Sequence, residues 1–414
     1  MALYDGTNGP TITVYLDNGV GSGYFVLGTS VLATNPPNTG AKLHTYTPFG
    51  QLIAFPSTDV RRVSIRRGRT REDQTFQPAT ATITFDNRSG NYDPQMLYSS
   101  YTNAGVSLLA AGTAMRVTAT WSGTEYALYS GFIEQVDIDQ SLDSTVTFTC
   151  VDGMKQLSNA TTLGWSVNPV STTNTAVFNN LLLQAGWQGG TTILDDSNIL
   201  IAGTKTFTDA TSIGTVLDTL AQSQGGRYYV DRSGKAVFES YANTTPATTS
   251  LYLSDQRTSG TIEYDSISIT PGSKYLLNTI TFTNGANSYT ATNTASITQY
   301  GEVIKSQDCY YYSKRGSLIS GLNGAAMQYL ADHFATPVYR VDSVEFDVMN
   351  LDGFGGSVWP SFLSLGIGQR VSVARTPVYT TAQTYDCIVQ SVDHDITPDN
   401  WRTSLQLSPS LPAY

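Results

Sequence analysis

The chain contains few charged residues and no long apolar run. Charged residues make up 14% of its 414 residues and the formal net charge is −10, which argues against a surface that binds nucleic acid over its whole extent. No apolar segment approaches the roughly 20 residues that a bilayer span needs, so we expect no membrane insertion by this chain. Residues 1–6 lack the basic start of a secretory signal, so assembly in a cytoplasm is expected.

Cysteine is also scarce. The three cysteines, Cys150, Cys309 and Cys387, are odd in number and far apart in the sequence. This pattern favours reduced thiols in the core, with a structural disulfide as the alternative.

The residue patterns of common enzymes are absent as well. The three histidines, His44, His333 and His394, have no metal-binding spacing, and there is neither a Gly-x-Ser-x-Gly elbow nor a phosphate-binding loop. In Asp393-His394-Asp395 a strand would turn both carboxylates away from the imidazole, which favours a polar strand edge over a metal site. Asp137, Asp139 and Asp143 lack the glycine and terminal glutamate of a calcium loop. We therefore predict no catalytic residues, no cofactor and no metal site.

Apolar residues make up 40% of the chain, and 36 glycines and 25 tyrosines accompany many serines and threonines. Such a composition is typical of β-structure with many turns, and 414 residues exceed what one ordinary core holds. We therefore expect two or three domains, mainly β.

The clearest pattern lies between Val60 and Pro94. Ala79, Ala81, Ile83 and Phe85 alternate with threonines, which predicts a half-buried strand over 79–85. The residues from Asp86 to Pro94 predict a sharp turn, and Val60–Arg71 predicts a second alternating strand that runs into a basic loop. The two strands are interpreted as core strands of a barrel or sandwich.

An arginine cluster occupies the second of these strands and the loop after it. Its members are Arg61, Arg62, Arg66, Arg67, Arg69 and Arg71. The cluster is either a solvated strand edge or an electrostatic contact with an acidic neighbour in an assembly. Direct DNA binding is disfavoured because no aromatic residues are interleaved with the arginines.

Three domains follow from the order of the patterns. Residues 1–160 read as a first β-barrel with no helix before Thr173, and residues 262–414 read as a second β-barrel with one helix over Ile319–Phe334. Residues 161–261 predict a small inserted α+β domain, with helices around 177–185 and 213–221 and a hairpin over 228–238. A strand is also expected over Ser296–Glu302.

The two β regions resemble each other. Gly112–Thr118 parallels Gly366–Ser372, Phe132–Asp139 parallels Cys387–Asp395 with one residue inserted, and Ile83–Asp86 parallels Val344–Asp347. Several pairs in the same order favour a duplicated domain over chance similarity of strands. Two similar barrels in one chain would let three chains build a ring of six quasi-equivalent units.

The blocks Ser64–Glu72, Ala79–Arg88 and Asn91–Pro94 resemble the opening of minor tail proteins of long-tailed bacteriophages, most of all the tail-tip hub. The resemblance implies a trimer with two tube-like β-barrels per chain that joins the tail tube to distal tip proteins. It also implies a structural, non-enzymatic virion component at the tail tip. Its expected partners are distal tail or tail-tube proteins above, the tape measure protein, and tail fibre or tip proteins below.

DNA would pass through the lumen without specific binding, because the acidic balance of the chain lines part of the lumen and like charge lowers non-specific affinity for DNA. Two alternatives remain open. One is a hexameric distal tail ring protein, which the internal repeat disfavours. The other is a receptor- or glycan-binding tail protein, suggested by tyrosines such as Tyr310, Tyr311 and Tyr312.

Overall fold

A computed structural model describes most of the chain in separate ranges. The described residues are 9–17, 52–71, 74–96, 100–103, 106–162, 165–167, 173–187, 189–194, 205–207, 210–223, 226–239, 246, 248–256, 258, 260–270, 276–284, 287–308, 328, 331–332, 334–337, 339–348, 358–378 and 380–410. The cluster Tyr310–Tyr312 lies outside them. The described part is mainly β, as the composition predicts.

The two strands predicted between Val60 and Phe85 are confirmed. They are β3 (Val60–Gly68) and β4 (Gln77–Asp86), which pair antiparallel. The alanines, Ile83 and Phe85 of β4 are buried, whereas its threonines are exposed or half-buried. Tight turns follow Asp86 as expected, and Asn87 Oδ1 accepts a hydrogen bond from the Tyr92 N–H at 2.9 Å.

A first unit of five antiparallel strands is built on this pair. Its order in the sheet is β3-β4-β9-β8-β7, where β7 is Ala114–Trp121, β8 is Thr124–Asp139 and β9 is Thr145–Val151. Strand β1 (Thr11–Asp17) extends the unit beyond β7, and β2 (Leu52–Ala54) follows it. A small hairpin of β5 (Thr102–Asn103) and β6 (Val106–Ser107) lies apart from this sheet.

A second unit near the end of the chain has the same order. It runs β17-β21-β24-β23-β22, with β17 at Ser266–Thr270, β21 at Arg340–Asp347, β22 at Arg370–Arg375, β23 at Gln383–Thr397 and β24 at Asn400–Pro409. Its neighbours β15 (Thr249–Ser254) and β16 (Ile262–Glu263) continue in parallel from β22. The repeat in the sequence therefore corresponds to a repeat in strand order.

The hydrogen bonds at the start of β7 and β22 repeat as well. The Gly112 N–H donates to Ile133 O at 2.7 Å, and the Gly368 N–H donates to Val389 O at 2.8 Å. Both glycines have positive φ, 91° and 83°, which other residues rarely adopt. Gly112 thus corresponds to Gly368, two residues beyond the Gly366 that the sequence comparison aligns with it.

The remainder of the repeat agrees with the sequence comparison more closely. The pairing of β8 with β9 shifts between Ile133 and Gln135, and that of β23 with β24 shifts between Val389 and Ser391. Residues 132–139 therefore match 388–395 without the predicted insertion. The match of Ile83–Asp86 with Val344–Asp347 is consistent with the register of both units.

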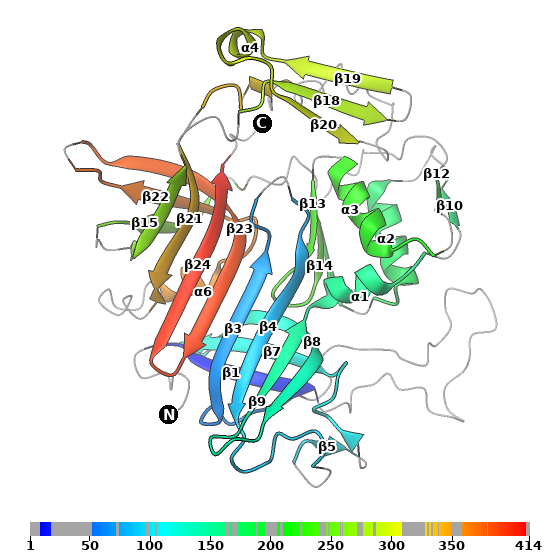
Figure 1. The fold of residues 1–414 in the computed structure, drawn as a ribbon, viewed down its shortest axis with the longest axis vertical. Helices are drawn as coiled ribbons and strands as arrows, with labels where there is room; N and C mark the ends of the chain where they lie inside the picture. Colours follow the sequence, from blue (N-terminus) through cyan, green and yellow to red (C-terminus); the bar gives the residue numbers. More distant parts are fainter. Residues whose placement is uncertain are drawn as a thin grey trace.

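The two units are joined edge to edge. The second half of β23 pairs antiparallel with β3, from Ser391 opposite Gly68 to Ile396 opposite Val63. One hydrophobic core runs beneath both units and includes Phe85, Phe148, Val344 and Leu405. Strands β17-β21-β24-β23-β3-β4-β9-β8 thus form one continuous run, here called the eight-strand run, part of which is seen side by side in Figure 1. Neither unit closes into a barrel within the described residues.

A helix between the two units ties them further. Helix α6 (Trp359–Ser364), which the sequence analysis did not predict, places Trp359 in the core with its ring 5.7 Å from Trp121 of β7 and 6.0 Å from Trp401 of β24. Proline in its first turn suits a helix start.

A second, separate core lies beneath α1 (Gly153–Asn159), α2 (Asn174–Gln184) and α3 (Ile213–Ser223). The predicted helices α2 and α3 and the hairpin β13 (Arg227–Val230) and β14 (Ala236–Glu239) are confirmed. Strand β11 (Thr191–Leu194) joins the hairpin, and β10 (Trp165–Val167) pairs with β12 (Lys205–Phe207). The domain boundaries at 160 and 261 stay a prediction.

The expectation of no helix before Thr173 is wrong, because α1 begins at Gly153. The Asp152 side chain accepts a hydrogen bond from the Met154 N–H at 3.0 Å and so caps this helix. None of the helices in the described ranges is long and apolar enough to span a bilayer.

A three-stranded sheet of β19 (Asn287–Thr292), β18 (Thr279–Asn284) and β20 (Ile304–Asp308) lies beside α4 (Thr294–Tyr300), at the top of Figure 1. The strand predicted over Ser296–Glu302 is wrong, since residues 294–300 are helical. Asn293 caps this helix through the Ser296 N–H, and Gly301, at φ 82°, ends it. Of the helix predicted over 319–334, only residues 328, 331, 332 and 334 are described, too few to test it.

Candidate functional site: the polar face of the eight-strand run

One face of the eight-strand run packs on the core and the other is polar. Ser64 of β3 pairs with Asp395 of β23 on one side and with Thr82 of β4 on the other. Because paired residues share a face, alternate residues of all eight strands form one surface, here called the polar face. Its threonines and serines give it small side chains over most of its area.

Carboxylates outnumber guanidinium groups on the polar face. The acidic members are Asp86, Asp137, Asp139, Glu345, Asp347, Asp393 and Asp395, and the basic members are Arg61, Arg62, Arg66 and Arg402. The face therefore carries net negative charge, as does the whole chain.

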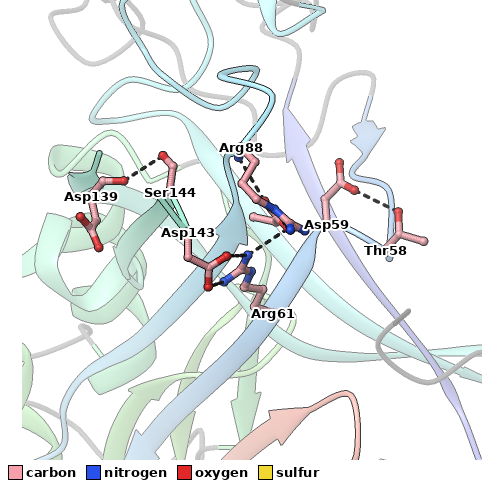
Figure 2. Close-up of polar contacts among 8 residues, drawn as sticks. Thr58, Asp59, Arg61, Arg88, Asp139, Asp143 and Ser144 are labelled. Carbon is pink, nitrogen blue, oxygen red and sulfur yellow. Dashed lines mark hydrogen bonds and ion pairs between the residues drawn. The ribbon is translucent and has the colours of Figure 1, made fainter. Parts of the chain in front are cut away.

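Arg61 lies at one end of this face in a network of carboxylates (Figure 2). Its guanidinium donates to both oxygens of Asp143, at 2.8 and 2.7 Å, and to Asp86 at 3.0 Å. Asp86 also pairs with Arg88, and the hydrogen bonds from Arg88 lower the pKa of Asp86 well below its usual range, with a further contribution from Arg61. The Arg61 guanidinium is thus paired with carboxylates of the same chain.

Arg62 and Arg66 lie at the junction of the two units. Arg62 makes a bidentate ion pair with Asp395 of β23, both distances being 2.8 Å. Arg66 is exposed and lies opposite Asp393, whose pKa is raised by burial even though Arg66 and Arg67 oppose the shift. Both arginines therefore face carboxylates of the other repeat unit.

The side chains of the other three arginines do not lie on the polar face. Arg67 is buried on the opposite side of β3, where desolvation and the neighbouring Arg232 lower its pKa to about 10. Arg69 Nε donates to Gln390 Oε1 at 2.8 Å, and its guanidinium lies 4.4 Å from the Phe76 ring centroid. Arg71 is half-buried in the turn after β3, where its carbonyl oxygen accepts from the Gln74 N–H.

The structure therefore does not bring the six arginines together into one basic patch.

An open groove of about 640 Å³ lies beside Arg66 and Arg69, and Gln77, Thr80 and Asp393 also line it. Whether the arginines contact an acidic neighbour stays a prediction, which now concerns Arg66 most directly because its side chain is exposed.

The Asp393-His394-Asp395 segment alternates as predicted. His394 is buried, and its Nδ1 accepts from Trp401 Nε1 at 3.3 Å and lies 3.0 Å from Thr403 Oγ1. Burial first, and then Arg67 and Arg232, lower the pKa of His394 to about 3, so the ring is neutral at pH 7. Asp395 lies on the opposite face, paired with Arg62.

The carboxylates considered as cation ligands have other partners. Asp143 pairs with Arg61, Asp139 Oδ1 accepts from the Ser141 N–H at 3.1 Å, and Asp137 Oδ1 accepts from Gln135 at 2.7 Å. Within the described ranges, no group of three or more His, Cys, Asp or Glu side chains is arranged to hold a metal ion. Cys150 and Cys387 are free and buried, whereas Cys309 lies outside these ranges.

The edges of the eight-strand run are not predicted from the sequence. Residues 134–139 of β8 pair with β9 on one side only, and β17 pairs with β21 alone among the described strands. The repeat was the signal that could have shown this, because the equivalent part of β23 does have a second partner, β3.

No protein-family model and no curated protein sequence matches the chain. Among solved structures, the tail protein from Neisseria meningitidis MC58 aligns with a TM-score of 0.59 and 13% identity over 98% of this chain and 99% of that one. The 43 kDa tail protein of prophage MuSo2 from Shewanella oneidensis aligns with a TM-score of 0.53 and 14% identity over 88% of this chain and 98% of that one. The chain has the fold of these tail proteins, and the resemblance to phage tail proteins seen in the sequence is confirmed at the level of the fold.

Proposed function

We propose that the chain is a structural protein of a bacteriophage tail, the trimeric hub of the tail tip. In this role it joins the tail tube to the distal tip proteins and forms part of the DNA channel. Its work is geometric and electrostatic, with no catalytic step.

The observation that carries the proposal is the repeat of one five-stranded unit within a chain that has the fold of tail proteins. A chain with two like units supplies six units from three copies, which matches a threefold tip to a sixfold tube. A distal ring protein would need only one unit per copy. The repeat therefore favours the hub over the ring.

The size of the eight-strand run fits a channel. Three copies supply twenty-four strands, and strands about 4.8 Å apart and tilted by about 40° close a cylinder roughly 50 Å across between backbones. Side chains narrow this by about 10 Å in total, since facing sheets pack about 10 Å apart. The remaining channel is wider than a DNA duplex.

The polar face supports the same assignment. In the ring it lines the channel, because its opposite face is already buried on the core. The excess of carboxylates on this face repels DNA phosphates, and the face offers few guanidinium groups for them to bind. DNA then passes without specific binding.

The expected partners are distal tail or tail-tube proteins above, the tape measure protein, and tail fibre or tip proteins below. The exposed Arg66 is proposed as a contact for an acidic segment that enters the channel.

Labelling of phage particles with an antibody raised against this chain tests the proposal. We expect label at the distal end of the tail only, seen by negative-stain electron microscopy. Label along the tube, on the capsid or on free fibres would overturn the hub assignment.

A further inference from the structure

We propose that copies of this chain assemble head to tail by pairing the free edge of β8, residues 134–139, with β17 of the next copy. The proposal rests on the proposed ring and specifies the surface through which its copies meet. It is argued from the repeat, because the chain already contains one example of this contact.

The internal example is the junction of β23 with β3. On one side β23 pairs with β24 along most of its length, and on the other side it pairs first with β22 and then, from Ser391, with β3. In the repeat, β23 corresponds to β8, β24 to β9, and β22 to β7. Strand β8 pairs with β9 and β7 in the same way, but the place of β3 beside residues 134–139 is empty among the described strands.

The strand that corresponds to β3 is β17. Val63 of β3 pairs with Ile83 of β4, and Ile267 of β17 pairs with Val344 of β21, the counterpart of Ile83. Strand β3 is covered by β23, whereas β17 has no partner beyond β21 within the described ranges. Among the described strands, the eight-strand run thus has one unpaired edge at each end, and the two edges are the counterparts of a pair that already exists.

The repeat fixes the register of the new pair. Residues 135–139 of β8 match 391–395 of β23, and Ser268 and Ile269 match Ser64 and Ile65. Asp139 should therefore lie opposite Ser268, as Asp395 lies opposite Ser64, and Ile138 should lie opposite Ile269, as His394 lies opposite Ile65. The Ser–Asp pair recurs with the same residue types.

Burial at the two positions agrees with this register. His394 is 5% exposed and Ile65 is fully buried, since the internal junction covers both. Ile138 is 36% exposed, and Ile269 is half-buried although it packs on the core. An exposed isoleucine on an unpaired strand edge favours pairing with another chain. In the proposed contact, the second copy buries this side chain.

The contact is heterologous, since β8 and β17 are different surfaces, so repeated pairing generates a ring or an open filament. The right-handed twist of a continuous sheet favours closure. A ring of three is the closed form that the proposed function requires.

Disulfide trapping of the full chain tests the register. The variant Ile138→Cys with Ile269→Cys should give covalent oligomers up to trimer under mild oxidation, which reducing agent reverts to monomer on denaturing gels. The matched control is Ile138→Cys with Val378→Cys, because Val378 is 76% exposed and lies outside both edges. It should stay at the monomer position, as should the unsubstituted chain.

Light scattering on the same samples separates the outcomes. A trimer mass with trapping at 138 and 269 is expected, and a trimer mass without trapping would overturn the edge pairing while leaving the hub proposal intact. A monomer mass at high protein concentration, without trapping, would also overturn the pairing. The antibody labelling of phage particles would then test the hub assignment separately.

A charge exchange gives a second readout that does not depend on oxidation. Ile138→Lys alone should reduce the trimer at least tenfold at a fixed concentration, and Ile138→Lys with Ile269→Glu should restore it, because the two side chains then lie opposite each other with opposite charge. Equal loss in both variants, with unchanged circular dichroism, would contradict the register.

Discussion

At the scale of single residues, Gly68 lies where the backbones of the two units approach closely. Its φ is 119°, and a Cβ atom there would lie 2.2 Å from Gln390 O and 2.6 Å from Ser391 Cα. No side chain fits between these backbones without moving them apart.

We therefore expect Gly68→Ala to lower the free energy of unfolding by more than about 2 kcal/mol. Gly90→Ala is the matched control, since Gly90 also has positive φ, 72°, but no atom lies within 4 Å of the added Cβ. It should cost about 1 kcal/mol for the backbone conformation alone. Urea denaturation followed by tryptophan fluorescence measures both, and equal losses would contradict the close approach.

Asp152 links stability to pH. Burial raises its pKa to about 7, although its hydrogen bonds and Arg67 oppose the shift. The folded state thus favours the neutral carboxyl, whose contribution to stability is complete below about pH 4, the value for an unfolded chain, and is lost as the pH rises through about 7.

Asp152→Asn should remove this dependence and keep the cap of α1, because an asparagine oxygen also accepts from the Met154 N–H. Relative to the unsubstituted chain, the variant should gain stability progressively between pH 4 and pH 8. Urea midpoints at a series of pH values measure the difference. A difference that does not vary with pH would mean that Asp152 is not held neutral.

At the scale of elements, the junction of β3 with β23 combines an exposed ion pair with buried apolar side chains. Arg62 and Asp395 are 57% and 44% exposed, whereas Val63, Ile65 and Ile396 are fully buried. Exposed pairs contribute little because water screens them, and buried aliphatic side chains contribute much more.

Arg62→Ala should therefore cost less than about 1 kcal/mol, and this loss should shrink with added salt. Ile65→Ala should cost about 2–5 kcal/mol at any salt concentration. Denaturation in low and high salt checks the ranking, and a larger loss for Arg62→Ala would show that charge rather than packing holds the units together.

Period-two alternation is enough to predict β3 and β4, and helical spacing is enough for α2 and α3. The short helices α1, α4 and α6 were missed, because six or seven residues show too little periodicity and depend on caps at Asp152 and Asn293 and on a proline start. The repeat was found in the sequence, but its alignment at Gly112 was two residues off because the turn glycine is Gly368 rather than Gly366.

The candidate site was predicted only in part. Alternation along β3 already separates Arg62 and Arg66 from Arg67, yet the cluster was treated as one surface. The pairing of β3 with β23 joins residues more than 300 positions apart. Pattern along one strand carries no information on which distant edge covers it, so the continuous sheet could not be predicted.

At the scale of the whole molecule, both units share one core, so we expect them to unfold together. Phe85 and its counterpart Phe346 are both fully buried in that core. Phe85→Ala and Phe346→Ala should each cost about 3–5 kcal/mol and lower the midpoint of the same transition. Calorimetry and urea titration measure the number of unfolding transitions and their midpoints. Two separate transitions, of which each variant lowers only one, would show that the units are independent barrels.

The central claim is that each chain supplies two units to a ring of six. Counting the copies of this chain in intact tails, by cryo-electron microscopy of the tip without imposed symmetry, tests it most directly. The account predicts three copies, each with both units in one continuous ring and β8 beside β17 of the next copy. Six copies with one unit each in the ring would contradict it and make the chain a distal ring protein.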